Sequence, residues 1–335
     1  MDVPNIFAIA TKELSQDAFI TWLLQWADEL YQKKDRAGLH TIGQNFVKFL
    51  LGKVIDTNNI KITTVEAGRQ WCNIDIWADI NSEYFIIIED KTNTYEHDEQ
   101  LERYAALVEK EYGKTRKIIC IYIKTELESL NQIKEIQKKG WAYCGRQELL
   151  GFLLSQNSVD NIFVDYVNYL KEKDELSNSF YQYSNLYTWE SVKGLYINIQ
   201  NKLNEWSDWD YVANPSGGFL GLWFHFTQCL SNHDREFYLQ IENNCYDRCD
   251  LYIKICGNWN REVSYLYGKL EHLQNICKDF GLTISKPVRY RPGEYTSLAI
   301  INDVFLESNG KLDLDNLFKK IDEAMKLVNE LAHNS

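Results

Sequence analysis

Hydrophobic positions recur at helical spacing near the start of the chain. Between residues 15 and 32 the apolar side chains share one face of a helix: Phe19, Ile20, Leu23, Leu24, Ala27 and Leu30. We expect Ser15 to be the N-cap of this helix, with Asp17 in its acidic first turn. A similar periodicity predicts a second helix over 42–54. The chain is therefore expected to open with two amphipathic helices.

The pattern then changes to alternation, which is typical of strands. Three runs predict strands: 60–67, 72–80 and 84–91. A helix predicted over 97–111 separates them from the nearly continuous apolar run 117–123, which is typical of a strand covered on both faces. A strand, a helix and a further strand form a parallel unit. Three more elements follow: a helix over 130–138, a strand over 141–144 and a helix from 147.

This order, α-β-β-β-α-β with additions, predicts an α/β fold with a mixed sheet flanked by helices. The polar stretch 171–185 is the predicted boundary, giving one domain over 1–175 and a second over 176–335. Helices and strands in the second part predict an α+β domain. The predicted helices are 190–203, 261–280 and one from 315, and the predicted strands are 219–227, 236–242, 250–256 and two around Pro287 and Ala299.

Composition narrows the class of protein. The 335 residues are 45% hydrophobic and 25% charged, which is ordinary for a globular chain of two domains. No apolar run reaches the length of a membrane span, and the first residues lack a basic-then-apolar signal segment, so we expect a soluble, cytoplasmic protein. The eight cysteines are then expected to be reduced thiols. Cys245, Cys249 and Cys256 are spaced too loosely to favour zinc over buried strand positions.

The net charge of -12 argues against a protein that coats nucleic acid through bulk charge. It does not exclude a local basic groove. Lys286, Arg289 and Arg291 cluster late in the chain, and either a solvated face or a phosphate contact would explain them.

The candidate chemistry lies on the predicted hairpin of 72–80 and 84–91. Within the first strand the even positions are apolar, so Asp75 points to the opposite face, and Glu89 and Lys91 share one face of the partner strand. A three-residue loop at 81–83 pairs Ile80 with Tyr84 and sets Asp75 opposite Glu89. A two-residue loop would instead set Asp75 opposite Ile88. The three-residue loop gathers Asp75, Glu89 and Lys91 at one place.

Two neighbouring carboxylates repel each other unless they share a proton or bind a cation. Oxygen ligands favour Mg²⁺ or Mn²⁺, and a nearby lysine can stabilise charge that builds up on a phosphate. The same three residues would also fit a solvated salt-bridge ladder. Spacing alone does not decide between a metal-dependent site and that ladder.

The run Ile74-Asp75-Ile76, followed by Glu89-Asp90-Lys91 at the end of an apolar strand, resembles the PD-(D/E)XK nuclease superfamily. The order of elements is similar to that family's core, and the resemblance covers about residues 8–155. It implies Asp75 and Glu89 as metal ligands and Lys91 as the catalytic lysine. The proline of the family's name is absent, because Asn73-Ile74 precedes Asp75.

Flanking residues extend the resemblance. Glu13 is similar to an acidic residue that this family often carries at its first helix, and Gln100 and Tyr104 resemble a Gln-Leu-x-x-Tyr motif of several subfamilies. Glu66, on the strand before the hairpin, is similar to an extra acidic residue of some members. The resemblance implies that Glu13 and Gln100 hold water, metal or the lysine, with Glu66 and Tyr104 as additional candidates.

The resemblance implies a Mg²⁺-dependent nuclease, with Mn²⁺ as a substitute, and most directly a DNA endonuclease of bacterial defence or DNA processing. Lys286, Arg289 and Arg291 are then candidates for nucleic-acid contact by a second domain that binds substrate or mediates self-association. Two alternatives stay open. One is a non-catalytic module on the same fold that binds nucleic acid or protein. The other is a nuclease that cleaves only when a partner or signal molecule assembles it, and a homo-oligomer is one such assembly.

Overall fold

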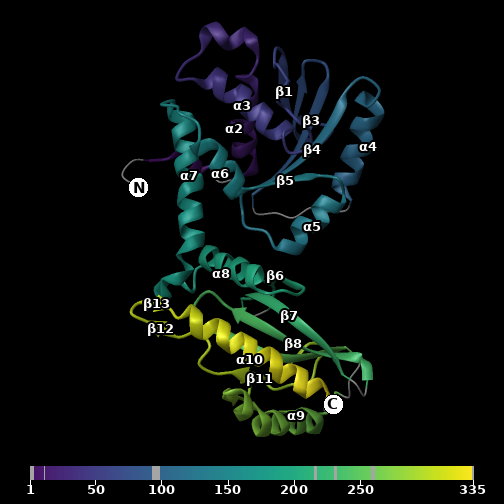
Figure 1. Ribbon diagram of the computed structural model, residues 1–335, viewed down its shortest axis with the longest axis vertical. Coiled ribbons are helices and arrows are strands. Elements are labelled where there is room, and N and C mark those ends of the chain that lie inside the picture. Colours follow the sequence, from purple (N-terminus) through teal and green to yellow (C-terminus); the bar gives the residue numbers. More distant parts are fainter. Residues whose placement is uncertain are drawn as a thin grey trace. The chain divides into compact units, whose positions relative to one another are not determined.

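A computed structural model of the chain describes residues 4–10, 12–92, 99–214, 217–229, 232–257 and 261–333 (Figure 1). The chain forms two compact units. The first comprises Met1–Glu128 and Gln132–Glu175, and the second comprises Ser129–Asn131 and Leu176–Ser335. Among the described residues, no helix is long and apolar enough to cross a membrane.

The first unit is built on a five-stranded mixed sheet. Its strands, in spatial order, are β1 (Val65–Trp71), β2 (Ile74–Ile80), β3 (Tyr84–Lys91), β4 (Lys117–Lys124) and β5 (Ala142–Gly145). The pairs β1–β2 and β2–β3 are antiparallel, and β3–β4 and β4–β5 are parallel. The parallel step from β3 to β4 passes through helix α4 (Gln100–Tyr112). This is the α/β architecture with a mixed sheet that the sequence pattern predicts.

Helices cover both faces of this sheet. Alternate residues such as Ile86 and Ile88 of β3 pack in one core cluster with α2 (Glu13–Gln25) and α3 (Leu39–Leu51). Phe85 and Ile87 pack in a second cluster with Leu101, Tyr104 and Val108 of α4. Further α-helices up to Ser177 are α1 (Ile6–Ile9), α5 (Leu130–Lys138), α6 (Arg146–Leu154) and α7 (Asn161–Ser177). The two clusters explain why β3 is almost continuously apolar, because both of its faces are buried.

The first long helix differs from its prediction at both ends. It begins at Glu13, so Ser15 lies within the helix and is not its N-cap, and it ends at Gln25. The apolar periodicity continues beyond that point, but Asp28 is extended, and its carboxylate accepts hydrogen bonds from the backbone N–H groups of Leu30 and Val65, both at 2.8 Å. Asp28 therefore caps the short 3₁₀ helix η1 (Glu29–Lys34) and fixes the start of β1.

The strand predicted over 60–67 is displaced to Val65–Trp71. The backbone N–H groups of Thr63 and Thr64 donate to the side chain of Asn81 instead of to a neighbouring strand. Trp71 pairs with Ile74, and the two residues between them, Cys72 and Asn73, have positive φ of 53° and 67°. This is the geometry of a tight two-residue hairpin turn, so Cys72 and Asn73 do not belong to the strand predicted to start there.

The second unit is built on a six-stranded antiparallel sheet. In spatial order its strands are β10 (Ile284–Ser285), β11 (Thr296–Ile301), β9 (Cys249–Gly257), β8 (Asn232–Asn243), β7 (Phe219–Cys229) and β6 (Ser207–Val212). Helix α8 (Trp189–Lys202) contacts β6 and β7, α9 (Val263–Ile276) contacts β11, and α10 (Leu314–His333) contacts β7 and β8. The short elements are η2 (Asn178–Tyr181), η3 (Tyr183–Asn185), η4 (Cys277–Phe280), β12 (Glu307–Ser308) and β13 (Lys311–Leu312). The pattern missed β6, β12 and β13.

Two kinds of side chain alternate along the central strands of this second sheet. Leu239 and Ile241 of β8 are fully buried, and their neighbours Gln240 and Glu242 point to the opposite face. The same alternation along β9 places Tyr252 and Lys254 beside them. One face of the sheet is therefore apolar and the other carries buried polar and charged groups.

Candidate active site

Asp75, Glu89 and Lys91 converge at the end of the β2–β3 hairpin. The strands pair from Ile80–Tyr84 to Ile76–Ile88, which is the register that the three-residue loop predicts. The Nζ atom of Lys91 forms an ion pair with Glu89 Oε1 and lies 3.6 Å from Asp75 Oδ2. Asp75 Oδ2 also accepts a hydrogen bond of 3.1 Å from the backbone N–H of Asp90. The hairpin itself thus places the three charged groups on one face.

Helix α4 fixes the orientation of Glu89. Gln100 Nε2 donates to Glu89 Oε1 at 2.7 Å and to the hydroxyl of Tyr104 at 2.9 Å. The Tyr104 hydroxyl donates in turn to the carbonyl of Asn73 at 2.6 Å, in the turn that precedes Asp75. Gln100 and Tyr104 are four residues apart and so lie on one face of the helix. The Gln-Leu-x-x-Tyr run therefore connects Glu89 to the turn next to Asp75.

Glu13 approaches the same site from the first turn of α2. Its Oε1 accepts a hydrogen bond of 3.2 Å from the backbone N–H of Thr92, the residue after Lys91. The Glu13 carboxylate is also close enough to Lys91 to contribute to the raised pKa of that ammonium. Glu13, Gln100 and Tyr104 thus lie around the trio of Asp75, Glu89 and Lys91.

Burial controls the charge states of the trio. Glu89 has no exposed side-chain surface, and Lys91 and Asp75 are 9% and 18% exposed. Burial, reinforced by the neighbouring Asp75 carboxylate, raises the pKa of Glu89 to about 8. Burial acts to lower the pKa of Lys91, but Glu89, Asp75 and Glu13 together outweigh it and the pKa is raised. Lys91 therefore stays a cation, whereas Glu89 exchanges its proton near neutral pH.

The residue between Glu89 and Lys91 points to the other face of the sheet. Asp90 is fully buried, and its Oδ1 accepts a hydrogen bond of 2.5 Å from Gln16 Nε2 of α2. Asp17 lies beside it, and burial raises the pKa of Asp17 to about 6. Burial, followed by the charge of Asp17, raises the pKa of Asp90 well above its usual value, so the pair shares a proton near neutral pH.

This buried acid pair was missed from the sequence. The sequence predicts Asp17 in the acidic first turn of a helix, but the helix begins at Glu13, and Asp17 is 1% exposed on the helix face that packs against the sheet. Gln16 accepts hydrogen bonds from Thr125 Oγ1 at 2.8 Å and Tyr166 Oη at 3.0 Å. Gln16 and Asp17 stand four and three residues before the buried Ile20. This helical spacing indicates that they lie on the buried face of the helix, and it was the signal available in the sequence.

Glu66, unlike Glu13, Gln100 and Tyr104, lies apart from the trio. Glu66 is exposed and pairs with Asp79, which is four residues along β2 from Asp75, or about 13 Å at the rise of a strand. Lys286, Arg289 and Arg291 belong to the second unit. Lys286 Nζ donates to the hydroxyl of Tyr267 at 2.7 Å and lies 4.7 Å from the centre of its ring.

The residues of the trio fit a divalent metal ion. Glu89 Oε2 is buried and has no hydrogen-bond partner among the described residues, so an acceptor oxygen is available there. Within the same part of the chain, no group of three or more His, Cys, Asp or Glu side chains could hold a metal. Two carboxylates suit Mg²⁺, which usually binds few protein side chains and retains water, better than they suit zinc.

A mixed sheet of this topology, with two acids and a lysine on one face of its antiparallel hairpin, defines a restriction-endonuclease-like core. A scan against protein-family models matches residues 4–190 to the PD-(D/E)XK nuclease superfamily. The chain belongs to this superfamily. The match includes all of the first unit's sheet and reaches the start of α8. Searches of curated proteins and of solved structures find no match.

Proposed function

We propose that the protein is a metal-dependent nuclease that hydrolyses phosphodiester bonds, acting as a DNA endonuclease. The observation that carries the proposal is the convergence of Lys91 with Glu89 and Asp75 on one face of the hairpin. Membership in a nuclease superfamily supports it. The assignment of DNA, and of a role in bacterial defence or DNA processing, rests on the resemblance of the motifs.

Each residue has a distinct role in this proposal. Asp75 and Glu89 would hold a Mg²⁺ ion, which supplies charge stabilisation at the phosphate when bound. The ammonium of Lys91 orients the attacking water and stabilises the negative charge that develops on the phosphoryl oxygens. Gln100, held by Tyr104, keeps the Glu89 carboxylate in one orientation. Glu13 helps to fix the backbone that follows Lys91.

Buried charge favours catalysis over the alternative of a binding module. Burial of Glu89 and Lys91 costs free energy because it disfavours the charged form of each side chain. A protein that only binds nucleic acid does not need a buried pair of this kind. A solvated salt-bridge ladder is also disfavoured, because the exposed fraction is zero for the Glu89 side chain and 9% for Lys91. The hydrogen bond from Gln100 to Glu89 also fixes the orientation of this carboxylate.

The test is a cleavage assay on DNA and RNA with Mg²⁺ or Mn²⁺, comparing the full chain with Asp75→Ala and Lys91→Ala. Both substitutions should abolish metal-dependent cleavage. Asp79→Asn is the matched control, because Asp79 is on the same face of the same strand but pairs with Arg116 at 3.0 Å. Metal-dependent cleavage that survives both alanine substitutions would refute the assignment of the site.

The second unit is proposed to contact the substrate or to mediate self-association. Arg289 and Arg291 are exposed, so replacing both with glutamate should weaken DNA binding at low salt. Unchanged affinity would remove this segment from the substrate path. Light scattering on the intact protein tests self-association directly, and activity that appears only in an oligomer would favour cleavage that depends on assembly.

A further inference from the structure

The second unit contains a cavity of about 500 Å³, which is a size typical of small-molecule sites. Its floor is the polar face of the sheet, formed by β7, β8, β9 and β11. Its edges are formed by Asn214 and Gly218 and by parts of the connecting segments 244–248 and 287–289. The lining residues that matter here are Phe219, Arg248, Asp250, Tyr252, Arg289 and Ser297. The cavity therefore combines apolar, acidic and basic surfaces.

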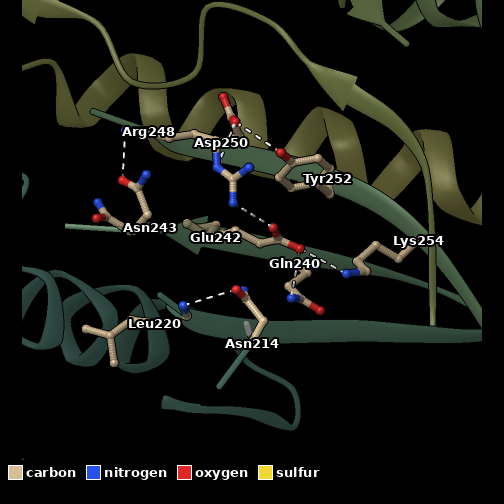
Figure 2. A network of polar contacts seen from close by, with 12 residues as sticks. Asn214, Leu220, Gln240, Glu242, Asn243, Arg248, Asp250, Tyr252 and Lys254 are labelled. Atoms are coloured by element: carbon tan, nitrogen blue, oxygen red, sulfur yellow. Dashed lines mark hydrogen bonds and ion pairs between the residues drawn. The ribbon is translucent and has the colours of Figure 1, made fainter. Parts of the chain in front are cut away.

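A hydrogen-bonded network organises the floor of this cavity (Figure 2). Glu242 is 7% exposed, and its Oε1 accepts hydrogen bonds from Lys254 Nζ at 2.9 Å and from Gln240 Nε2 at 3.2 Å. The Tyr252 hydroxyl donates to Asp250 Oδ2 at 3.1 Å. The buried charges of this floor are thus compensated before any ligand arrives, which makes the surface preorganised for binding.

Arg248 extends from this network toward Glu242 and Asp250 (Figure 2). Its contacts are long, 3.5 Å to Glu242 Oε2 and 3.8 Å to Asp250 Oδ2, whereas strong charge-assisted hydrogen bonds are about 2.7–2.9 Å. The loop that carries Arg248 is held by Asn244, whose Oδ1 accepts the Arg248 backbone N–H at 3.0 Å. Arg248 is therefore positioned at the cavity with donors still available, since a guanidinium has five.

Arg289 supplies a second guanidinium. It is exposed, it lines the cavity, and it has no acidic partner among the described residues. Two guanidinium groups at one cavity match the several acceptor oxygens of a phosphate group. The Asp250 carboxylate offers the opposite chemistry, because both of its contacts involve Oδ2 and leave Oδ1 as an acceptor. A simple anion would interact with the two guanidinium groups but not with the Asp250 carboxylate.

We propose that this cavity binds a mononucleotide. Its phosphate would interact with Arg289 and Arg248, amino or ring N–H groups of its base would donate to Asp250, and its flat rings would contact Phe219 and Tyr252. The cavity size fits one such molecule, and Ser297 adds a hydroxyl to the lining. This inference concerns the second unit alone and does not depend on the nuclease proposal.

A comparison of Arg289 with Arg291 distinguishes mononucleotide binding in the cavity from binding of a nucleic-acid backbone. Both arginines are exposed and lie two residues apart, but only Arg289 lines the cavity. A polynucleotide held by bulk charge would depend on both residues, whereas a mononucleotide in the cavity depends on Arg289 and not on Arg291. Arg291→Ala is therefore a control of matched charge, size and location.

The experiment is isothermal titration calorimetry of the full chain with AMP, GMP, CMP and UMP, in buffer with EDTA. Inorganic phosphate and a single-stranded oligonucleotide serve as comparison probes. At least one mononucleotide should bind with a dissociation constant below about 1 mM, and Arg289→Ala should weaken it by roughly tenfold or more. Arg291→Ala and Lys91→Ala should leave that binding unchanged.

Several outcomes would overturn the proposal. These are the absence of binding by all four mononucleotides, equal binding by Arg289→Ala, and loss of binding in Lys91→Ala, which would place the ligand in the first unit. Equal affinity for inorganic phosphate would reduce the cavity to an anion site. Tight binding of the oligonucleotide that falls equally in Arg289→Ala and Arg291→Ala would assign the segment to a polynucleotide instead. Cleavage by the first unit is measured in a separate assay, so failure of this proposal and failure of the nuclease proposal are distinguishable.

Discussion

Replacement of Asp17 by asparagine should stabilise the protein above pH 6 and leave it unchanged near pH 4. Asp17 is 1% exposed, and burial is the largest cause that raises its pKa from 3.8 to about 6. In the unfolded chain this carboxyl loses its proton near pH 4, while the folded chain keeps it until about pH 6. The folded state therefore binds more protons in this window, and its stability falls as pH rises through it.

The magnitude follows from the size of the shift. A difference of about two pKa units corresponds to roughly 3 kcal/mol in the free energy of unfolding. The wild-type protein loses this stability between about pH 4 and pH 6 and does not regain it at higher pH. Asparagine does not titrate, so Asp17→Asn should remove this fall. The gain in the free energy of unfolding at pH 7.5 is at most about 3 kcal/mol, because the neighbouring Asp90 readjusts its own proton.

The assay is urea denaturation followed by tryptophan fluorescence at pH 4, 5, 6 and 7.5. Asp56→Asn is the control, because Asp56 lies on an exposed loop of the same unit and should show the pH dependence of the wild type. Parallel pH profiles for wild type and Asp17→Asn, or a variant that is less stable at pH 7.5, would refute the reasoning from burial.

Three further predictions concern the first unit. Gln100→Leu removes the 2.7 Å contact to Glu89 and should lower the cleavage rate by roughly 10–100-fold, with a smaller loss for Tyr104→Phe; equal rates in a steady-state assay would contradict the orienting role. Because the pKa of Glu89 is about 8 and a metal ion binds the ionised form, Mg²⁺ affinity measured by calorimetry should fall by roughly 20-fold from pH 8.5 to pH 6.5, and a flat profile would exclude Glu89 as the titrating ligand. A Cβ on Gly43 would lie 2.7 Å from the backbone of Ala27 and of Leu23, so Gly43→Ala should lower the free energy of unfolding by about 1–3 kcal/mol. Gly151→Ala meets no atom within 4 Å inside α6 and should be neutral or stabilising by up to about 1 kcal/mol, which thermal unfolding of both variants checks.

Much of the first unit's fold could be predicted because its information is local. The period of the apolar residues locates β2, β3 and α4, and the three residues at 81–83 set the hairpin register that brings Asp75 toward Glu89. The end of the first helix could not be predicted in the same way. Asp28 ends that helix region by binding the backbone of Val65, and a contact between residues so far apart in sequence leaves no periodic signal.

In the candidate site, too, local features could be predicted from the sequence and long-range contacts could not. The Gln100 and Tyr104 spacing on one helix face is visible in the sequence, and the structure places both residues beside Glu89. The acid pair of Asp17 and Asp90 depends on how α2 packs against β3, so neither residue reveals it alone. The segment Lys286–Arg291 was interpreted by its charge, but side-chain packing separates its members, since Lys286 contacts Tyr267 while Arg289 lines a cavity.

Asp90 has a consequence for any attempt to transfer this site to another scaffold. Its backbone N–H holds Asp75 on one face of the sheet, and its side chain is held by Gln16 on the other. A graft of Asp75, Glu89 and Lys91 alone would carry the groups on one face of the sheet without the contact on the other face that holds Asp90. The smallest portable unit of the site is therefore a section through the whole sheet, which includes the first helix behind it.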